Sequence, residues 1–163
     1  MNQTGRQADV LPQSGDPEPT TPFSVVAESG LLRLRHYRPT ASVSDDRSPV
    51  LLVYPVIKRP SILDLTPDRS VIGNLLAQGL DVYLTDWLPP GREDRKRGFN
   101  EYVNEDLNCA VDVIRALEDT PRVSLIGCCC GGLFSSVYTA FNPDKVGRLV
   151  NFAVPFSVDH PGS

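Results

Sequence analysis

The sequence lacks several features that would assign it to a specialised class of protein. It has no apolar run long enough to cross a membrane, and its polar first six residues do not have the form of a signal peptide. The net charge of −4 gives no reason to expect nucleic acid or an anionic membrane as a partner. The four cysteines are not spaced as a disulfide framework, and no internal repeat is visible. These absences favour a cytoplasmic globular protein without a membrane span.

What is present fits one domain preceded by a polar arm. At 163 residues, with 40% apolar and 22% charged side chains, the chain is long enough for one core. Residues 1–22 are rich in Gln, Pro, Ser, Thr and Gly, which predicts a disordered arm. Residues 23–163 are predicted to form the folded domain.

Apolar patterns typical of strands alternate with patterns typical of helices. Strands are predicted over 31–37, 50–54, 80–87, 123–126 and 148–154, the last as a buried strand. Thr66-Pro67-Asp68 is predicted to begin a helix that ends at Gly79, and Asn100 to cap a longer one with buried residues as far as Leu117. A further amphipathic helix is predicted over 133–141. The alternation predicts an α/β fold with a doubly wound, mostly parallel sheet.

The most informative stretch is Gly127-Cys128-Cys129-Cys130-Gly131, between a predicted strand and a predicted helix. This is the cysteine form of the nucleophile elbow of α/β-hydrolases, with glycines where neighbouring backbone must pass closely. Cys129 is the candidate nucleophile at a helix N-terminus, and the backbone N–H of Cys130 is the candidate oxyanion-hole donor. The Cys128 and Cys130 side chains are predicted bystanders, and Cys109 a core residue. The alternative is three small buried side chains; contiguous cysteines cannot surround one metal ion, so no metal site is predicted.

Loops at the carboxyl ends of the predicted strands supply the other candidates. Val56 or Ile57, after the strand over 50–54, is a candidate for the second oxyanion N–H, unless this loop is an ordinary connection. Asp86 is predicted to have a structural role, because the acid of such a triad comes after the nucleophile in the chain. The basic loop over 92–97 is predicted to be solvated; the alternative is an anion site for a nucleotide phosphate.

Three stretches carry a resemblance to one family. They are residues 63–70, 78–87 and 127–132, with the sequences LDLTPDRS, QGLDVYLTDW and GCCCGG. Together they resemble the polyhydroxyalkanoate synthases, particularly the class III catalytic subunit. The resemblance implies a polymerase of the α/β-hydrolase fold that takes 3-hydroxyacyl-coenzyme A as substrate, needs no other cofactor, and forms a thioester on Cys129. It also implies work at polyester granules, and a homodimer or a second synthase subunit as partner.

The chain departs from this family on the carboxyl side of the elbow. The triad Asp and His of the family lie in the later half of the fold, and the only histidines here are His36 and His160. His36 is expected at the surface, and His160 does not occur where the family's base belongs. Cys130 stands where the family generally has Gln. The expectation is therefore a partial fold, truncated after the strand that comes next after the elbow, with an open apolar edge and little activity alone.

Two other functions stay open at this point. One is a non-catalytic protein that binds granules or pairs with a complete synthase. The other is a thiol esterase of the same fold.

Overall fold

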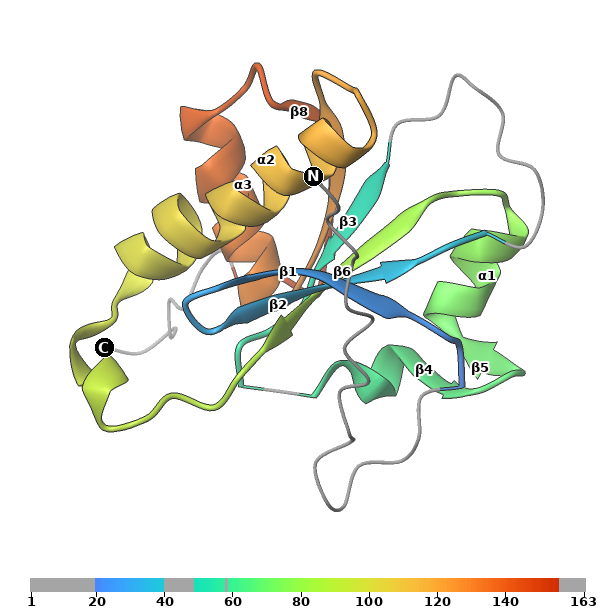
Figure 1. Cartoon of the computed structure of the whole chain (residues 1–163), viewed down its shortest axis with the longest axis horizontal. Helices are drawn as coiled ribbons and strands as arrows, with labels where there is room; N and C mark the ends of the chain where they lie inside the picture. Colours follow the sequence, from blue (N-terminus) through green and yellow to red (C-terminus); the bar gives the residue numbers. More distant parts are fainter. Residues whose placement is uncertain (1–19, 40–48, 58, 156–163) are drawn as a thin grey trace, which may run out of the picture.

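The computed structural model describes residues 20–39, 49–57 and 59–155. Its described residues contain a central sheet of six strands, with helices on both sides (Figure 1). The order of the strands across the sheet is β1-β2-β6-β3-β7-β8, and a small separate ladder joins β4 to β5. The main strands are β1 (Ser24–Ser29), β2 (Leu32–Tyr37), β3 (Val50–Val53), β6 (Val82–Trp87), β7 (Val123–Cys128) and β8 (Val146–Phe152). Of the predicted arm over 1–22, residues 1–19 lie outside the described residues, whereas Thr20 and Thr21 form hydrogen bonds with Asp64.

Four neighbouring strands, β6, β3, β7 and β8, run parallel, as the alternation of strand and helix patterns predicts. The antiparallel hairpin β1–β2 joins this parallel block through β6. The strand β1 was not predicted, because Ser24–Ser29 alternates only weakly between apolar and polar residues. Gly30, with a φ of +54°, makes the turn between the two strands.

Helices cover both faces of the sheet, so the doubly wound prediction is confirmed. The π-helical segment η3 (Glu101–Leu107) continues into α2 (Asn108–Leu117), which shares one face with α3 (Cys130–Phe141). The helix α1 (Val71–Ala77) packs on the other face, together with the short helix η1 (Pro60–Leu63) (Figure 1). A further short helix, η2 (Glu93–Lys96), lies in the basic loop after β6. No helix of the described residues is long and apolar enough to cross a membrane.

The predicted start of the first helix is wrong. Residues 64–66 form β4 and residues 69–70 form β5, and α1 begins only after Ser70. The hydroxyl of Ser70 accepts a hydrogen bond from the N–H of Gly73 at 2.7 Å, so Ser70 is the helix cap. The buried carboxylate of Asp64 accepts hydrogen bonds from Ser70 at 2.6 Å and from the Thr21 N–H at 2.7 Å, which holds this segment extended. The helix ends at Ala77, and Gly79, with a φ of +71°, follows as the predicted terminating glycine.

The second helix also begins differently. Asn100 has helical backbone angles and makes no side-chain cap, whereas the N–H of Gly98 donates to the Glu101 carboxylate at 2.7 Å. At the other end Leu117 is exposed, because the helix rotates it away from the sheet. Cys109 is half-buried, so its assignment to the core is also wrong.

The last strand is not buried as predicted. β8 is the outermost described strand on its side of the sheet, and most of its side chains are partly or fully exposed. Val150 and Phe152 are among the exposed large apolar residues. The expected open apolar edge is therefore present among the described strands.

Candidate active site

Cys129 lies at the tip of an abrupt turn from β7 into α3. Its φ of 52° and ψ of −125° belong to a region that residues with a side chain rarely adopt. Two hydrogen bonds hold the turn: the Cys129 N–H donates to Phe152 O at 3.2 Å, and the Gly132 N–H donates to Cys129 O at 3.0 Å. The predicted strand–turn–helix geometry of the elbow is thus present, and the thiol side chain is half-buried.

The glycines beside Cys129 are needed for close approach of backbone. A Cβ at Gly131 would clash with the carbonyl oxygen of Val53, because the two atoms would lie far closer than van der Waals contact. A Cβ at Gly127 would collide with the backbone of Gly132 and lie 2.6 Å from Asn151 Oδ1. Gly131 therefore allows the elbow to pack directly against the carboxyl end of β3, and Gly127 allows the end of β7 to pack against the start of α3 and Asn151 of β8.

The start of α3 gives the turn a positive electrostatic end. Cys130 is the first residue of this helix of 12 residues, where backbone N–H groups have no acceptor within the helix. Such N–H groups attract an anion or a developing oxyanion. Cys128 is different: its side chain packs against the core on the α1 face, and burial and the neighbouring Cys129 and Cys130 raise the pKa of its thiol. A raised pKa keeps Cys128 protonated at neutral pH, as suits a bystander.

The loop after β3 is held by two side chains of β6 that were not predicted from the sequence. The Tyr54 N–H donates to Thr85 Oγ1 at 2.9 Å, and Trp87 Nε1 donates to Tyr54 O at 2.9 Å. Both bonds are buried, and they fix the peptide groups of the residue that enters the Pro55–Ile57 turn. The only sequence signal is the alternation of Thr85 and Trp87 on one face of β6, which gives no indication of their partner.

Val56 and Ile57, the candidates for the second oxyanion donor, lie in this turn. Val56 is half-buried and packs against the core cluster that contains Phe134 of α3. Ile57 is 81% exposed, so its side chain has no packing role. The contact of Gly131 with Val53 brings the start of this loop against the elbow, as the oxyanion-hole prediction requires.

Asp86 is structural, as predicted. It is buried on the α1 face of the sheet, where Oδ2 accepts hydrogen bonds from Arg33 and Arg35, each at 2.7 Å. This arrangement pairs the carboxylate with two guanidinium groups and ties β2 to β6.

The histidines do not complete a triad among the described residues. His36 is buried rather than exposed, which corrects the prediction. It pairs across the sheet with Tyr83, the second residue of β6, whereas the elbow lies at the carboxyl end of β7. His160 lies outside the described residues. The described part of the chain therefore places no imidazole beside Cys129.

The basic loop after β6 divides into two parts. Arg97 is committed to an ion pair with the buried carboxylate of Asp106. Arg92 and Arg95 are exposed and, with Pro90 and Gly91, line a shallow hollow of the surface. The alternative of an anion site in this loop stays a prediction, with Arg92 and Arg95 as the exposed arginines that line the hollow.

Comparisons with known proteins agree with this geometry. The family described as alpha/beta hydrolase fold matches residues 63–161. The family described as Poly-beta-hydroxybutyrate polymerase (PhaC) N-terminus matches residues 13–75. A carboxyl esterase from Bacillus coagulans has a similar fold, with a TM-score of 0.62 at 13% identity over 81% of this chain and 44% of the esterase.

Two curated relatives are more similar in sequence. The poly(3-hydroxyalkanoate) polymerase subunit PhaC of Haloferax mediterranei is 42% identical over 87% of this chain. The PhaC subunit of Allochromatium vinosum is 38% identical over 85% of it. The chain spans only 29% and 39% of the lengths of these two relatives.

Proposed function

Because the chain belongs to the α/β-hydrolase fold family and is similar over most of its length to PhaC subunits, we propose that it carries the nucleophile of a poly(3-hydroxyalkanoate) polymerase. Cys129 is the residue that accepts the 3-hydroxyacyl group. The observation that carries the proposal is the position of Cys129 at the tip of the elbow, in the left-handed backbone region, at the start of α3.

The chemistry is an acyl transfer in two steps. The Cys129 sulfur attacks the thioester carbonyl of 3-hydroxyacyl-coenzyme A, the bond from carbonyl carbon to the coenzyme A sulfur breaks, and coenzyme A leaves as a thiol with the cysteine proton. The hydroxyl of a second acyl unit then attacks the Cys129 thioester; the new ester bond forms as the carbon–sulfur bond breaks, and the hydroxyl proton returns to the Cys129 sulfur. Covalent catalysis of this kind replaces one difficult transfer by two exchanges at an activated carbonyl.

In the proposed mechanism the Cys130 N–H binds the oxyanion of each tetrahedral intermediate, and Val56 or Ile57 supplies the second N–H from the turn after β3. Two features of the described residues support this arrangement. Thr85 and Trp87 hold that turn in place from β6. The N-terminus of α3 favours the thiolate form of a cysteine at the turn.

A general base is the part that the described residues do not supply near the elbow. A thiol without a base is only a few per cent thiolate at neutral pH, and loss of the base costs orders of magnitude in rate. We therefore propose that a group outside the described residues takes the proton of the Cys129 thiol. Such a group can come from a second polypeptide, and within this chain the candidate is His160.

The direct test is release of coenzyme A from 3-hydroxybutyryl-coenzyme A, followed by chromatography. It is run on the purified chain and on the chain mixed with the carboxyl-terminal part of a related PhaC subunit. We expect release chiefly in the mixture, abolished by Cys129→Ala and retained by Cys128→Ala. Equal release by the chain and its Cys129→Ala variant would contradict the proposal, and release by the chain alone that is lost in His160→Gln would make His160 the base.

The product separates polymerase from esterase. Polyester that accumulates with coenzyme A release supports a polymerase, whereas free 3-hydroxybutyrate without polymer supports a thiol esterase. No release by the chain alone or by the mixture, together with granule binding that survives Cys129→Ala, would favour a non-catalytic partner of a synthase.

We also propose that the chain works at the surface of cytoplasmic polyester granules together with a second synthase subunit or a second copy. The support is the resemblance to class III synthases and the exposed apolar residues of β8. Co-sedimentation of the purified chain with isolated granules, with and without the partner subunit, tests this assignment.

A further inference from the structure

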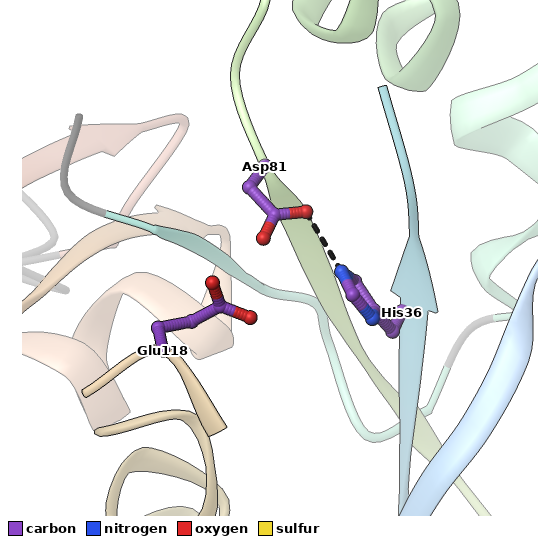
Figure 2. A group of neighbouring side chains, drawn as sticks. All are labelled: His36, Asp81 and Glu118. Carbon is purple, nitrogen blue, oxygen red and sulfur yellow. Dashed lines mark hydrogen bonds and ion pairs between the residues drawn. The ribbon is translucent and has the colours of Figure 1, made fainter. Parts of the chain in front are cut away.

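A second group of chemically active side chains lies away from the elbow, at the amino end of the parallel strands. His36 comes from the end of β2, Asp81 directly precedes β6, and Glu118 comes directly after the last residue of α2 (Figure 2). One ligand atom from each residue lies within 4.8 Å of those of the other two. Three segments that are far apart in the sequence thus present one imidazole and two carboxylates to a common point.

This group is distant from Cys129. The Val50 N–H donates to Asp81 O at 2.9 Å, which places Asp81 level with the first residue of β3. Val50 pairs with Ser124 of β7, five residues before Cys129. At the rise of a strand, this separates the two sites by about 16 Å along the sheet.

The surroundings orient the three side chains. His36 Nε2 lies 2.7 Å from Asp81 Oδ1, and the imidazole stacks on the Tyr83 ring with centroids 4.2 Å apart and planes 4° apart. The Tyr83 hydroxyl donates a hydrogen bond to Glu118 Oε1. The ring plane of His36 and one oxygen of Glu118 are therefore both fixed by Tyr83.

The two carboxylates of the group, those of Asp81 and Glu118, would be stabilised by a cation between them. Two carboxylates converge on one point, and the Asp81 side chain is only 14% exposed, so their mutual repulsion is poorly screened by water. Arg38 is a neighbouring cationic side chain, but it is exposed and its electrostatic interaction is with the Tyr83 hydroxyl. A divalent ion at the centre would neutralise both carboxylates and bind the neutral imidazole at the same time.

The donor set also fits a particular class of ion. One imidazole nitrogen and two carboxylate oxygens suit zinc and similar divalent transition metals, which bind such donors at short distances in tetrahedral geometry. Ligand atoms in tetrahedral geometry at those bond lengths lie about 3.3 Å apart. His36 Nε2 and Asp81 Oδ1, now 2.7 Å apart, would have to move slightly away from each other, and the Glu118 carboxylate would have to move slightly towards them. Tyr83 would then hold a ligating carboxylate from outside, as is usual around metal ligands.

We propose that His36, Asp81 and Glu118 form a binding site for a divalent transition metal ion of the zinc class. The ion would tie the carboxyl end of α2 to β2 and β6, and because the site is remote from Cys129 its role is to stabilise the fold. The proposal does not depend on the acyl-transfer function.

The test is titration of the metal-free, untagged full chain with Zn²⁺ by calorimetry and with Co²⁺ by absorption spectroscopy. Co²⁺ bound to nitrogen and oxygen alone gives visible bands without the near-ultraviolet charge-transfer band of a thiolate ligand. This distinction matters because Cys128, Cys129 and Cys130 are free thiols. We expect one equivalent of Co²⁺ without the thiolate band, and a higher melting temperature with Zn²⁺.

Two variants remove ligands while preserving shape. His36→Phe keeps an aromatic ring stacked on Tyr83, and Glu118→Gln keeps the side-chain length; each is expected to weaken binding at least about tenfold. Glu105→Gln, which makes the same change at an exposed carboxylate outside the group, is the control and should bind as the native chain does. Circular dichroism with a chelator establishes that each variant is folded.

Absence of binding by the native chain, or equal affinity in Glu118→Gln and Glu105→Gln, would overturn the proposal. A thiolate band in place of the nitrogen–oxygen spectrum would do so as well, because it would assign the ion to the cysteines.

Discussion

Cys129 combines the reactive group of the elbow with a backbone conformation that its own side chain disfavours. Its φ of 52° and ψ of −125° cost a residue with a Cβ about 1–3 kcal/mol. The hydrogen bonds to Phe152 and Gly132 and the close packing on β3 impose this conformation. The strained backbone of Cys129 thus lowers the stability of the fold at the residue whose thiol the proposed reaction requires.

A substitution that relieves this strain should stabilise the fold while removing the nucleophile. We expect Cys129→Gly to unfold with a free energy about 1 kcal/mol higher than Cys129→Ala, since glycine adopts positive φ without a steric penalty. Urea unfolding of the two variants measures the difference. A Gly variant that is no more stable than the Ala variant would show that the turn is unstrained.

Thr85 is expected to matter chiefly through the buried hydrogen bond that its hydroxyl accepts from the Tyr54 N–H, which is shorter than the 3.5 Å bond that it donates to Leu52 O. Thr85→Val keeps the shape of the side chain and leaves the Tyr54 N–H without its acceptor, which should lower the free energy of unfolding by about 1–3 kcal/mol. Thr139→Val is the control, because Thr139 Oγ1 only donates to a helical carbonyl, that of Ser135. Equal losses of stability in the two variants would count against a special role for Thr85.

At the scale of elements, the junction of β3 with the start of α3 allows no side chain at Gly131. Gly131→Ala places a methyl group against the Val53 carbonyl and should lower the free energy of unfolding by about 3 kcal/mol. Gly147→Ala in β8 is the control, because its nearest neighbour would be Arg122 Cβ at an ordinary 3.6 Å. Similar thermal unfolding of both variants would mean that α3 moves easily away from β3.

The carboxylate of Asp112 in α2 bonds to Lys145, the residue before β8, and so joins these two elements. Burial alone would raise the pKa of Asp112, but hydrogen bonds from Lys145 and Arg115, both at 2.8 Å, lower it overall. A lowered folded-state pKa means that the ion pairs stabilise the fold above the unfolded-state pKa of about 3.9 and that this contribution is lost as the pH falls through the folded value.

We therefore expect Asp112→Asn to lower the stability at neutral pH by at most about 1 kcal/mol, since the side chain is 41% exposed. The difference from the native chain should vanish in strongly acidic solution. Urea unfolding across this pH range measures it, with Asp68→Asn at an exposed carboxylate as the control. A difference that is independent of pH would indicate a cause other than the charge of Asp112.

At the scale of the whole molecule, the described sheet ends in a strand with exposed apolar side chains. Val150 is 55% exposed and Phe152 43%, and the strand has no described neighbour on its outer side. Such an edge favours association with another chain.

We expect the purified chain to associate with itself in a concentration-dependent way, and Val150→Lys to reduce this association. Analytical ultracentrifugation measures the effect. Ile62→Lys is the control, because Ile62 is equally exposed, at 54%, but lies in η1 rather than β8. The same reduction in both variants would show that added charge alone, and not the edge, is responsible.

Much of the architecture could be predicted from the sequence, because it depends on short local patterns. Short apolar segments alternating with helical patterns indicated the parallel strands β3, β6 and β7, and the Gly127–Gly131 spacing indicated the elbow that the backbone of Cys129 adopts. Each of these signals is contained within a few neighbouring residues. The oxyanion-hole roles of Cys130, Val56 and Ile57 stay predictions.

Only the tertiary structure decided the features that depend on a distant partner. Asp64 binds Thr21 and Ser70, which turns a predicted helix start into a strand; Thr85 and Trp87 hold Tyr54 from the neighbouring strand. His36, predicted at the surface, is buried because Tyr83 and Asp81 reach it from β6 and the residue before it. Sequence patterns report the periodicity of one segment, whereas these contacts arise from the order and register of strands that meet only in the folded chain.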